Sequence, residues 1–449
     1  MKHTLISAAV LAALAATAPA RADELADLKA EIAAQRQAAA AQQARLDALE
    51  KKLANVQQAA EQQAAAAQQS AAQAKKADAS GYAYGQGLTV NAGGATMNLY
   101  GLIDVSYVHI DHLAAGASSA GPRVAWFSGN RWGLTGKRPM GDSGLDMIFK
   151  LETEYLSQTG EFDDNTQMFG RDSWVGVQSD DFGKLTLGWQ NAPARDPIGS
   201  SIYGDAYGSA APSLEEGGYT NNNNFKHLIF YAGSASGTRM KNSVVWKKDF
   251  KNGLFASAAY QFNGAGGDGG FGNNTTKQFT LAYAGGSYNL AGFVTSAVVN
   301  NHTHKSYSFG GNTSFGPVRL NAGYYHYTAQ QNAAIGDRKD DAYTLSGKYA
   351  LSTAVDFELG YQTEKSKNAA FGKDGAVVGP IRAFNDGYGA ATAVNGTRST
   401  FYASVFYHFD KFTEVYLAGD SMKLKDASVL KSDGSKQQNE LAVGLRTRF

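Results

Sequence analysis

The sequence predicts an all-β transmembrane barrel of 16 antiparallel strands, preceded by an α-helical coiled coil. Three observations predict this fold class: heptad spacing near the N-terminus, a two-residue hydrophobic period from about residue 96, and an alternation of short turns with long loops. Glycine contributes 51 of the 449 residues and aromatic side chains 11%, a mixture typical of turns and strands. After the extreme N-terminus no apolar run reaches about 18 residues, so only strands could cross a membrane.

The composition also excludes several classes of function. The chain has 41 basic and 40 acidic residues, a net charge of +1, which gives no overall field to attract nucleic acid. It contains no cysteine, so disulfides, thiolate metal sites and cysteine nucleophiles are excluded.

The first 22 residues predict a secretory signal peptide. Lys2 and His3 form a basic start, residues 5–16 are apolar, and residues 18–22 offer the small side chains of a cleavage site. Cleavage after Ala22 would give an exported protein that begins at Asp23.

Residues 23–63 predict a coiled-coil oligomerisation segment. The segment has no glycine or proline and is rich in helix-favouring residues. Apolar and small side chains follow heptad spacing over about five repeats. The a and d positions are Leu25, Leu28, Ile32, Gln35, Ala39, Gln42, Leu46, Leu49, Leu53 and Val56. Residues 64–95, which are alanine- and glutamine-rich and then glycine-rich, predict a low-complexity linker.

Residues 96–449 predict the barrel. Most of the 16 strands have about ten residues, the length of a tilted strand that crosses a bilayer. Connections are short at one end of the barrel and long at the other. The one exception lies between the strands expected at 292–302 and 304–314, where a barrel of 16 strands requires a long loop that the sequence does not supply. A short turn is expected at 289–292. The strands are expected at 96–109, 128–138, 144–156, 168–178, 184–190, 240–248, 254–262, 276–288, 292–302, 304–314, 317–328, 340–350, 354–364, 398–408, 413–423 and 438–449.

Alternation assigns each strand two different faces. In the strand at 144–156, Met147, Phe149 and Leu151 share an apolar face, whereas Lys150 and Glu152 share the polar face. The last strand alternates in the same way and ends in Phe449.

Seven phrases in this order resemble a known family, the trimeric general diffusion porins of Gram-negative bacteria, of the beta-proteobacterial type. The phrases lie at 99–104, 130–136, 149–152, 168–176, 182–188, 242–246 and 443–449. The resemblance implies a homotrimer in the outer membrane, in contact with membrane lipid and lipopolysaccharide, with Phe449 as the signal for the barrel assembly machinery. The coiled coil is an addition to the usual family pattern; it would lie in the periplasm, where a contact with the cell wall is an open expectation.

The resemblance also implies an inward-folded constriction loop, at about 191–237. On it, Glu215 and Glu216, with Asp205 as a weaker candidate, would face a ladder formed by Arg131, Arg171 and Arg239. By alternation Asp104, Lys150 and Glu152 also face the lumen. Trp189 stands where the family often has an arginine, and Asp104 where many cation-preferring relatives have a lysine. Weak anion preference is the resulting hypothesis.

No residue pattern indicates an enzyme, a cofactor or a metal site. Residues 264–269 match a dinucleotide-binding pattern but lie between strands, without the helix that would receive a pyrophosphate. His302 and His304 share a strand face without a third ligand nearby in the sequence. Three functions remain: a passive channel for small hydrophilic solutes, a substrate-specific uptake channel for solutes such as dicarboxylates, and an envelope tether through the coiled coil.

Overall fold

The computed structural model divides the chain into two compact units, residues 1–71 and 72–449. Among the described residues there is no helix with the length and apolar character needed to cross a membrane. Residues 1–21, the bulk of the predicted signal peptide, lie outside the described part. The described residues are 22–74, 87–112, 120–124, 129–157, 159–162, 167–196, 231–250, 252–263, 272–370, 393–426 and 435–449.

The N-terminal unit is dominated by one helix, α2 (Ala22–Ala74), of 53 residues. It runs past residue 63, so the expected linker starts too early, because the alanine- and glutamine-rich sequence there favours helix. On the predicted heptad seam, Ile32, Leu46 and Leu49 are exposed, Leu49 to 58%. A long helix with an exposed apolar seam is compatible with a coiled coil, which stays a prediction.

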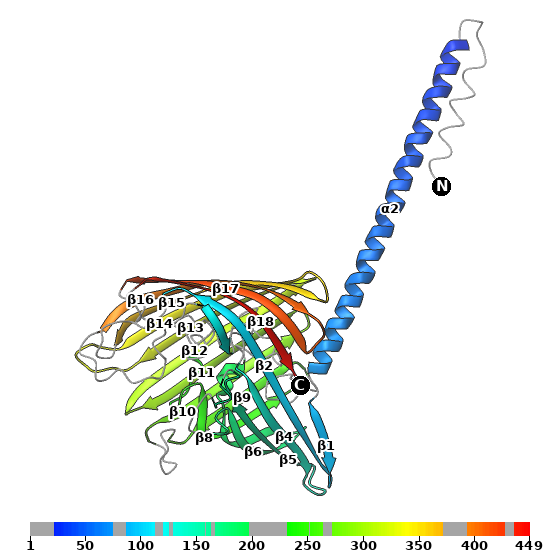
Figure 1. Cartoon of the computed structure of the whole chain (residues 1–449). Coiled ribbons are helices and arrows are strands. Elements are labelled where there is room, and N and C mark those ends of the chain that lie inside the picture. Colours follow the sequence, from blue (N-terminus) through cyan, green and yellow to red (C-terminus); the bar gives the residue numbers. More distant parts are fainter. Residues whose placement is uncertain are drawn as a thin grey trace. The chain divides into compact units, whose positions relative to one another are not determined.

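The second unit is an antiparallel barrel (Figure 1). Sixteen strands form the closed ring, in which β18 pairs with β2. All 16 expected strands are present, with shifted ends. The ring strands are β2 (Ala95–Ile110), β4 (Arg131–Pro139), β5 (Asp146–Glu154), β6 (Asp172–Ser179), β7 (Gly183–Asn191), β8 (Arg239–Asp249), β9 (Leu254–Gln261), β10 (Thr275–Gly285), β11 (Tyr288–Val299), β12 (His302–Phe315), β13 (Val318–Ala329), β14 (Arg338–Ala350), β15 (Val355–Ala370), β16 (Ala393–His408), β17 (Thr413–Asp426) and β18 (Gln437–Arg448).

Two short strands that the sequence analysis missed pair with β2. β1 (Leu88–Ala92) forms a hairpin with the start of β2, and β3 (Ala120–Val124) pairs with its second half. β1 lies inside the range expected to be a linker, so that expectation is wrong for residues 88–92. The alternating sequence of β1 and the turn at Gly93 and Gly94 explain the hairpin.

The two faces of the barrel differ as alternation requires. On β18, Leu441 and Val443 are more than half exposed on the outer face, whereas Ala442 is fully buried and Glu440 is buried on the inner face. Apolar side chains that point outward suit a hydrocarbon environment, and polar ones that point inward suit a water-filled lumen.

The connection between β11 and β12 corrects the expectation of a long loop. Asn300 and Asn301 alone join the strands, with φ values of 48° and 66°. Successive positive φ angles are those of a type I′ turn, which asparagine tolerates. The preceding turn is also displaced, to Gly286 and Ser287 instead of 289–292, so that Tyr288 already belongs to β11.

The last residue closes the ring. Phe449 exchanges two backbone hydrogen bonds with Gly101 of β2, at 2.9 and 3.0 Å. A Cβ atom at Gly101 would lie 2.2 Å from the Phe449 ring, so only glycine leaves room for it.

Candidate functional site

Glu152 on β5 is the centre of a buried charge cluster on the inner wall. Its carboxylate accepts hydrogen bonds from the Tyr100 hydroxyl at 2.7 Å and from Arg171 Nε at 2.6 Å. Lys150 Nζ lies 3.2 Å from the same carboxylate. The alternation of β5 places Lys150 and Glu152 on the inner face together, and Arg171 comes directly before β6.

The basic members of this cluster each have a second acidic partner. Arg171 also forms an ion pair with Glu154, and Lys150 Nζ lies 3.0 Å from Asp172. All five side chains have exposures of 12% or less. Cations and carboxylates therefore alternate on one wall, and their fields largely cancel over a few ångströms.

Arg239 differs from its neighbours. It is the first residue of β8, and its electrostatic neighbours include Arg171, Arg195, Glu154 and Asp172. Its Nε atom is buried and has no hydrogen-bond partner in the described structure. The guanidinium groups of Arg195 and Arg239 thus add positive charge beside the paired cluster.

The connection from β7 to β8 begins and ends inside the barrel. It opens with a short 3₁₀ helix, η1 (Pro193–Arg195). Gln278, on the inner face of β10, binds both ends of the connection. Its Oε1 accepts from the Ala194 amide at 3.3 Å, and its Nε2 donates to the carbonyls of Ala232 at 3.2 Å and Gly233 at 2.7 Å.

Further contacts hold these ends against the wall. The Tyr231 hydroxyl donates to Asp340 of β14 at 3.0 Å, several strands away from β8. Lys247 Nζ donates to Asp196 at 2.6 Å. Burial raises the pKa of the Asp196 carboxyl, and the attraction of Lys247 offsets part of this effect. Since both ends contact inner walls far around the ring, the described ends of the connection, residues 192–196 and 231–238, lie in the lumen.

The predicted site residues divide into those placed and those outside the described part. Arg131, Arg171, Lys150 and Glu152 are buried together at the inner wall. Asp104 is also buried on the inner face and accepts a hydrogen bond from the Tyr416 hydroxyl at 2.6 Å. The acidic counterparts on the loop, Asp205, Glu215 and Glu216, fall in residues 197–230, outside the described residues.

The comparisons with known proteins agree with this architecture. The pattern of a family described as "Gram-negative porin" matches residues 54–427. The chain belongs to the Gram-negative porin family. An outer membrane porin protein of Bordetella pertussis is 26% identical over 326 residues, which cover 68% of this chain and 74% of that protein. This porin is therefore an outer-membrane channel protein.

Solved structures show the same fold as this porin. An anion-selective porin from Comamonas acidovorans has a TM-score of 0.58 at 19% identity, over 79% of this chain and all of that one. OmpT of Vibrio cholerae, in a trimer form, has a TM-score of 0.53 at 14% identity, over 79% of this chain and all of that one. OmpF of Salmonella typhi, solved in complex with daunomycin, has a TM-score of 0.52 at 15% identity, over 81% of this chain and all of that one.

The porin has a second inner charge network, near the short turns, that the sequence analysis missed. Glu414 of β17 accepts from Arg446 and Arg448 of β18. His408 of β16 lies between two carboxylates: its Nδ1 is 2.8 Å from Glu414 and its Nε2 is 2.8 Å from Asp356 of β15. Alternation indicates which residues of each strand face inward. Which of these residues contact one another across strands depends on the strand register, which alternation does not give.

Of the other functional residues that the sequence analysis missed, one could have been found from the sequence. Glu154 shares the polar face of β5 with Glu152, so alternation indicated it. Gln278 and Tyr231 carry no such signal, because their partners come from distant strands. Among the described residues no group of three potential metal ligands is found, and His304 instead lies 2.6 Å from the Tyr327 hydroxyl.

Proposed function

We propose that three copies of this porin form water-filled channels for passive diffusion of small hydrophilic solutes and ions, with weak anion preference. One observation carries the proposal: the described ends of the β7–β8 connection contact the inner wall beside basic groups, and of these Arg239 has an unpartnered Nε in the described structure. The trimer-form OmpT and the anion-selective Comamonas porin support the assembly and the sign.

The preference is expected to be weak because most charge at the waist is paired. Arg171 and Lys150 face Glu152, Glu154 and Asp172 on the same wall. Arg195 and Arg239 add positive charge, which we propose is opposed by Glu215, Glu216 and Asp205. Charges of opposite sign across a waist orient water and dipolar solutes and select ions by sign.

The test is the reversal potential of the trimer in a planar bilayer under a salt gradient. Wild-type protein should favour anions modestly, and Arg239→Gln should move the potential toward zero. Lys411→Gln, an exposed lysine in the β16–β17 turn, is the matched control and should leave it unchanged. Strong cation selectivity of the wild type would contradict the proposal.

A substrate-specific uptake channel is the second candidate. Arg195 and Arg239 lie near each other at the waist, and paired guanidinium groups suit the two ends of a dicarboxylate. A conductance that saturates, and that millimolar succinate blocks, would favour this function over passive diffusion.

The third candidate is an envelope tether through α2. A helix of 53 residues is about 80 Å long, and a coiled coil of three such helices would bury the exposed Ile32, Leu46 and Leu49. Deletion of residues 23–80 should leave conductance intact; loss of envelope integrity in the deletion strain would favour the tether.

We also propose Phe449, held beside Gly101, as the residue that the barrel assembly machinery reads.

A further inference from the structure

The inner wall at the short-turn end of the barrel carries a charge row over five neighbouring strands. Cations lie on β14, β16 and β18, and carboxylates lie on the strands between them, β15 and β17. Since neighbouring strands are about 4.8 Å apart, the row spans about 19 Å of the mouth. The cations are Lys348, His408, Arg446 and Arg448, and the carboxylates are Asp356, Glu358 and Glu414.

The strand register holds the members of the charge row in contact. Lys348 is the register partner of Glu358, and its Nζ atom lies 3.4 Å from that carboxylate. Glu414 is the register partner of His408 on one side and of Arg446 on the other. The order of charges around the mouth therefore follows from the closed sheet.

His408 fits the charge row as an imidazolium cation. Its two ring nitrogens lie 2.8 Å from carboxylates of Glu414 and Asp356. A neutral imidazole has one donor nitrogen and one acceptor nitrogen, so one of these contacts would then join two acceptors. The ring also stacks on Phe406 with an angle of 8° between the planes, and the Arg446 guanidinium lies 5.7 Å from the centre of the Phe406 ring. The row thus contains four cations and three carboxylates.

The cations of the charge row are more exposed than its carboxylates. Side-chain exposure is 32% for Lys348, 25% for His408 and 21% for Arg448, whereas no carboxylate of the row exceeds 11%. Arg446, at 7%, is the exception. A solute at this mouth therefore meets mainly positive charge, although the row as a whole is almost neutral.

The buried cluster around Glu152 has the opposite order of exposure. Lys150 and Arg171 are only 1% and 2% exposed, whereas Glu154 is 12% exposed. The cations of that cluster are covered, and its most exposed member is a carboxylate. The two clusters therefore present different charges to the lumen, although both consist of ion pairs.

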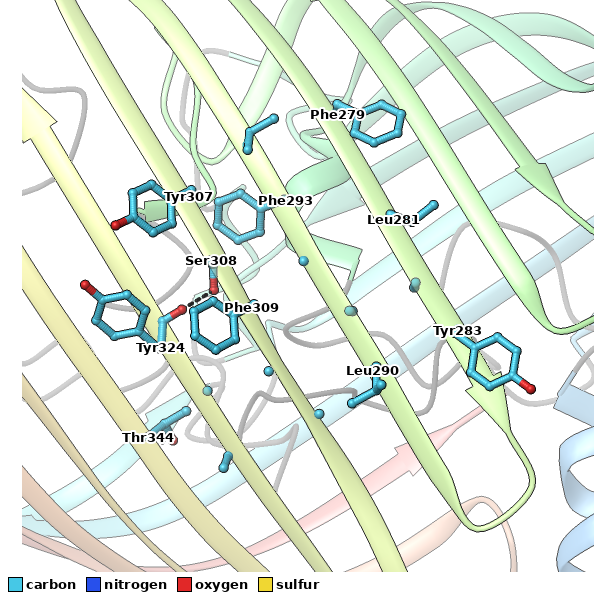
Figure 2. Close-up of a pocket in the computed structure, with 18 of the residues that line it drawn as sticks. Phe279, Leu281, Tyr283, Leu290, Phe293, Tyr307, Ser308, Phe309, Tyr324 and Thr344 are labelled. Atoms are coloured by element: carbon cyan, nitrogen blue, oxygen red, sulfur yellow. Dashed lines mark hydrogen bonds between the residues drawn. The ribbon is translucent and has the colours of Figure 1, made fainter.

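A hollow elsewhere in the barrel wall is unsuited to anions. A groove of about 1000 Å³ lies across β10 to β14 (Figure 2). Its lining includes Phe279, Leu290 and Phe309, and the described lining contains no charged side chain. The positively charged surface at the short-turn mouth is thus a separate feature of the barrel.

We propose that the short-turn mouth is an anion-binding vestibule, in which Lys348, His408 and Arg448 attract small anions such as carboxylates and phosphate. In a barrel of this type the short turns are periplasmic, so the vestibule is where solutes leave the channel for the periplasm. Fixed cations at a mouth with low-dielectric walls raise the local concentration of anions. The proposal rests on the proposed channel function, but it does not depend on Arg239 or on any other residue of the waist.

The test is the reversal potential of single inserted full-length trimers in a planar bilayer, with KCl as the probe. Each trimer is measured with a salt gradient in both directions, between about 0.1 M and about 0.01 M, where the Debye lengths are about 10 Å and about 30 Å. Wild type should show the larger anion preference when the dilute solution bathes the vestibule, because salt then screens its cations least. The two directions should therefore give potentials of different size.

The first variant removes two exposed cations. Lys348→Gln with Arg448→Gln should reduce the difference between the two directions to about half or less, because only His408 remains as an exposed cation of the row. Lys423→Gln with Lys425→Gln, two exposed lysines on β17, removes the same charge and should leave the difference unchanged. If the first variant does not fold, Arg448→Gln alone serves, and it should give a smaller reduction of the same kind.

A second variant separates exposed charge from net charge. Lys348→Gln with Glu358→Gln removes one ion pair and leaves the net charge unchanged. It should still reduce the difference between the two directions, because the lost cation is exposed and the lost carboxylate is buried. No change or an increase in this variant would overturn the proposal, and so would equal effects of the first variant and its control.

The wild-type result also separates the vestibule from the proposed function. Anion preference of equal size in both directions would overturn the vestibule alone. Cation selectivity in both directions would overturn both the vestibule and the proposed anion preference.

Discussion

Two inner walls of the barrel share the same alternation but have different roles. The wall formed by β2, β4, β5 and the start of β6 contains buried ions in contact with one another, centred on Glu152. The wall from β10 to β13 is almost uncharged. Its inner face offers Gln278, Phe293, Tyr325 and Tyr327, which contact the ends of the β7–β8 connection or the apolar cluster around Tyr231.

The difference shows how one barrel separates two tasks. We propose that the charged wall sets the field that a solute meets, whereas the uncharged wall holds the described ends of the β7–β8 connection. The outer faces of both walls are mainly apolar, apart from lysines such as Lys277 and Lys305 near the strand ends. The difference between the walls therefore lies in the side chains that face inward. Variants on the two walls should therefore change different observables.

The largest effect is expected from Glu152→Leu. The change leaves Lys150 and Arg171 without their shared buried partner, and breaking a buried ion pair in this way costs about 3–5 kcal/mol. The unfolding free energy in a urea titration should fall by about that amount, and the loss of one negative charge should increase anion preference.

Glu161→Gln is the control for this variant, because Glu161 is exposed outside the strands. It should leave both stability and selectivity unchanged. If Glu152→Leu were equally silent, the charged wall would not be the organising element of the waist.

An intermediate effect is expected from Gln278→Ala on the other wall. The change removes three hydrogen bonds to the loop ends, worth about 1 kcal/mol each. Single-channel recordings should show more current noise and a larger mean conductance, with little change in reversal potential. The control is Thr295→Ala, on the inner face of β11 and without a hydrogen bond to the loop ends, which should behave like wild type. A shifted reversal potential in Gln278→Ala would contradict the separation of tasks.

The smallest effect concerns pH. Because burial raises the pKa of Asp196, this carboxyl should take up a proton at a higher pH than an ordinary aspartate as the solution is acidified. Neutral Asp196 leaves Lys247 uncompensated, so anion preference should increase on acidification before exposed carboxyls titrate. Asp196→Asn should show the increased preference at neutral pH and lose this step, while Asp180→Asn, at an exposed turn position, should retain it.

The sequence predicted all 16 strands because each has an apolar and a polar face that must meet different solvents. Alternation also placed Asp104, Lys150 and Glu152 on the inner face. Turn positions were less predictable: the β11–β12 connection depends on two asparagines with positive φ, a conformation that few sequence signals specify.

The contacts of the site were mostly beyond the sequence. Arg171 could be assigned to the waist through family resemblance, but its partners Glu152 and Glu154 follow from register between β5 and the start of β6. Gln278 and Tyr231 contact residues far away in the chain, so their roles depend on closure of the ring.

The most direct test of a passive, weakly anion-preferring channel is the conductance of the reconstituted wild-type trimer across a range of salt concentrations. The conductance should rise in proportion to salt without saturation, and a salt gradient should give a small reversal potential of the anion-preferring sign. Saturation at low millimolar concentration, or a large reversal potential of the cation-selective sign, would contradict it.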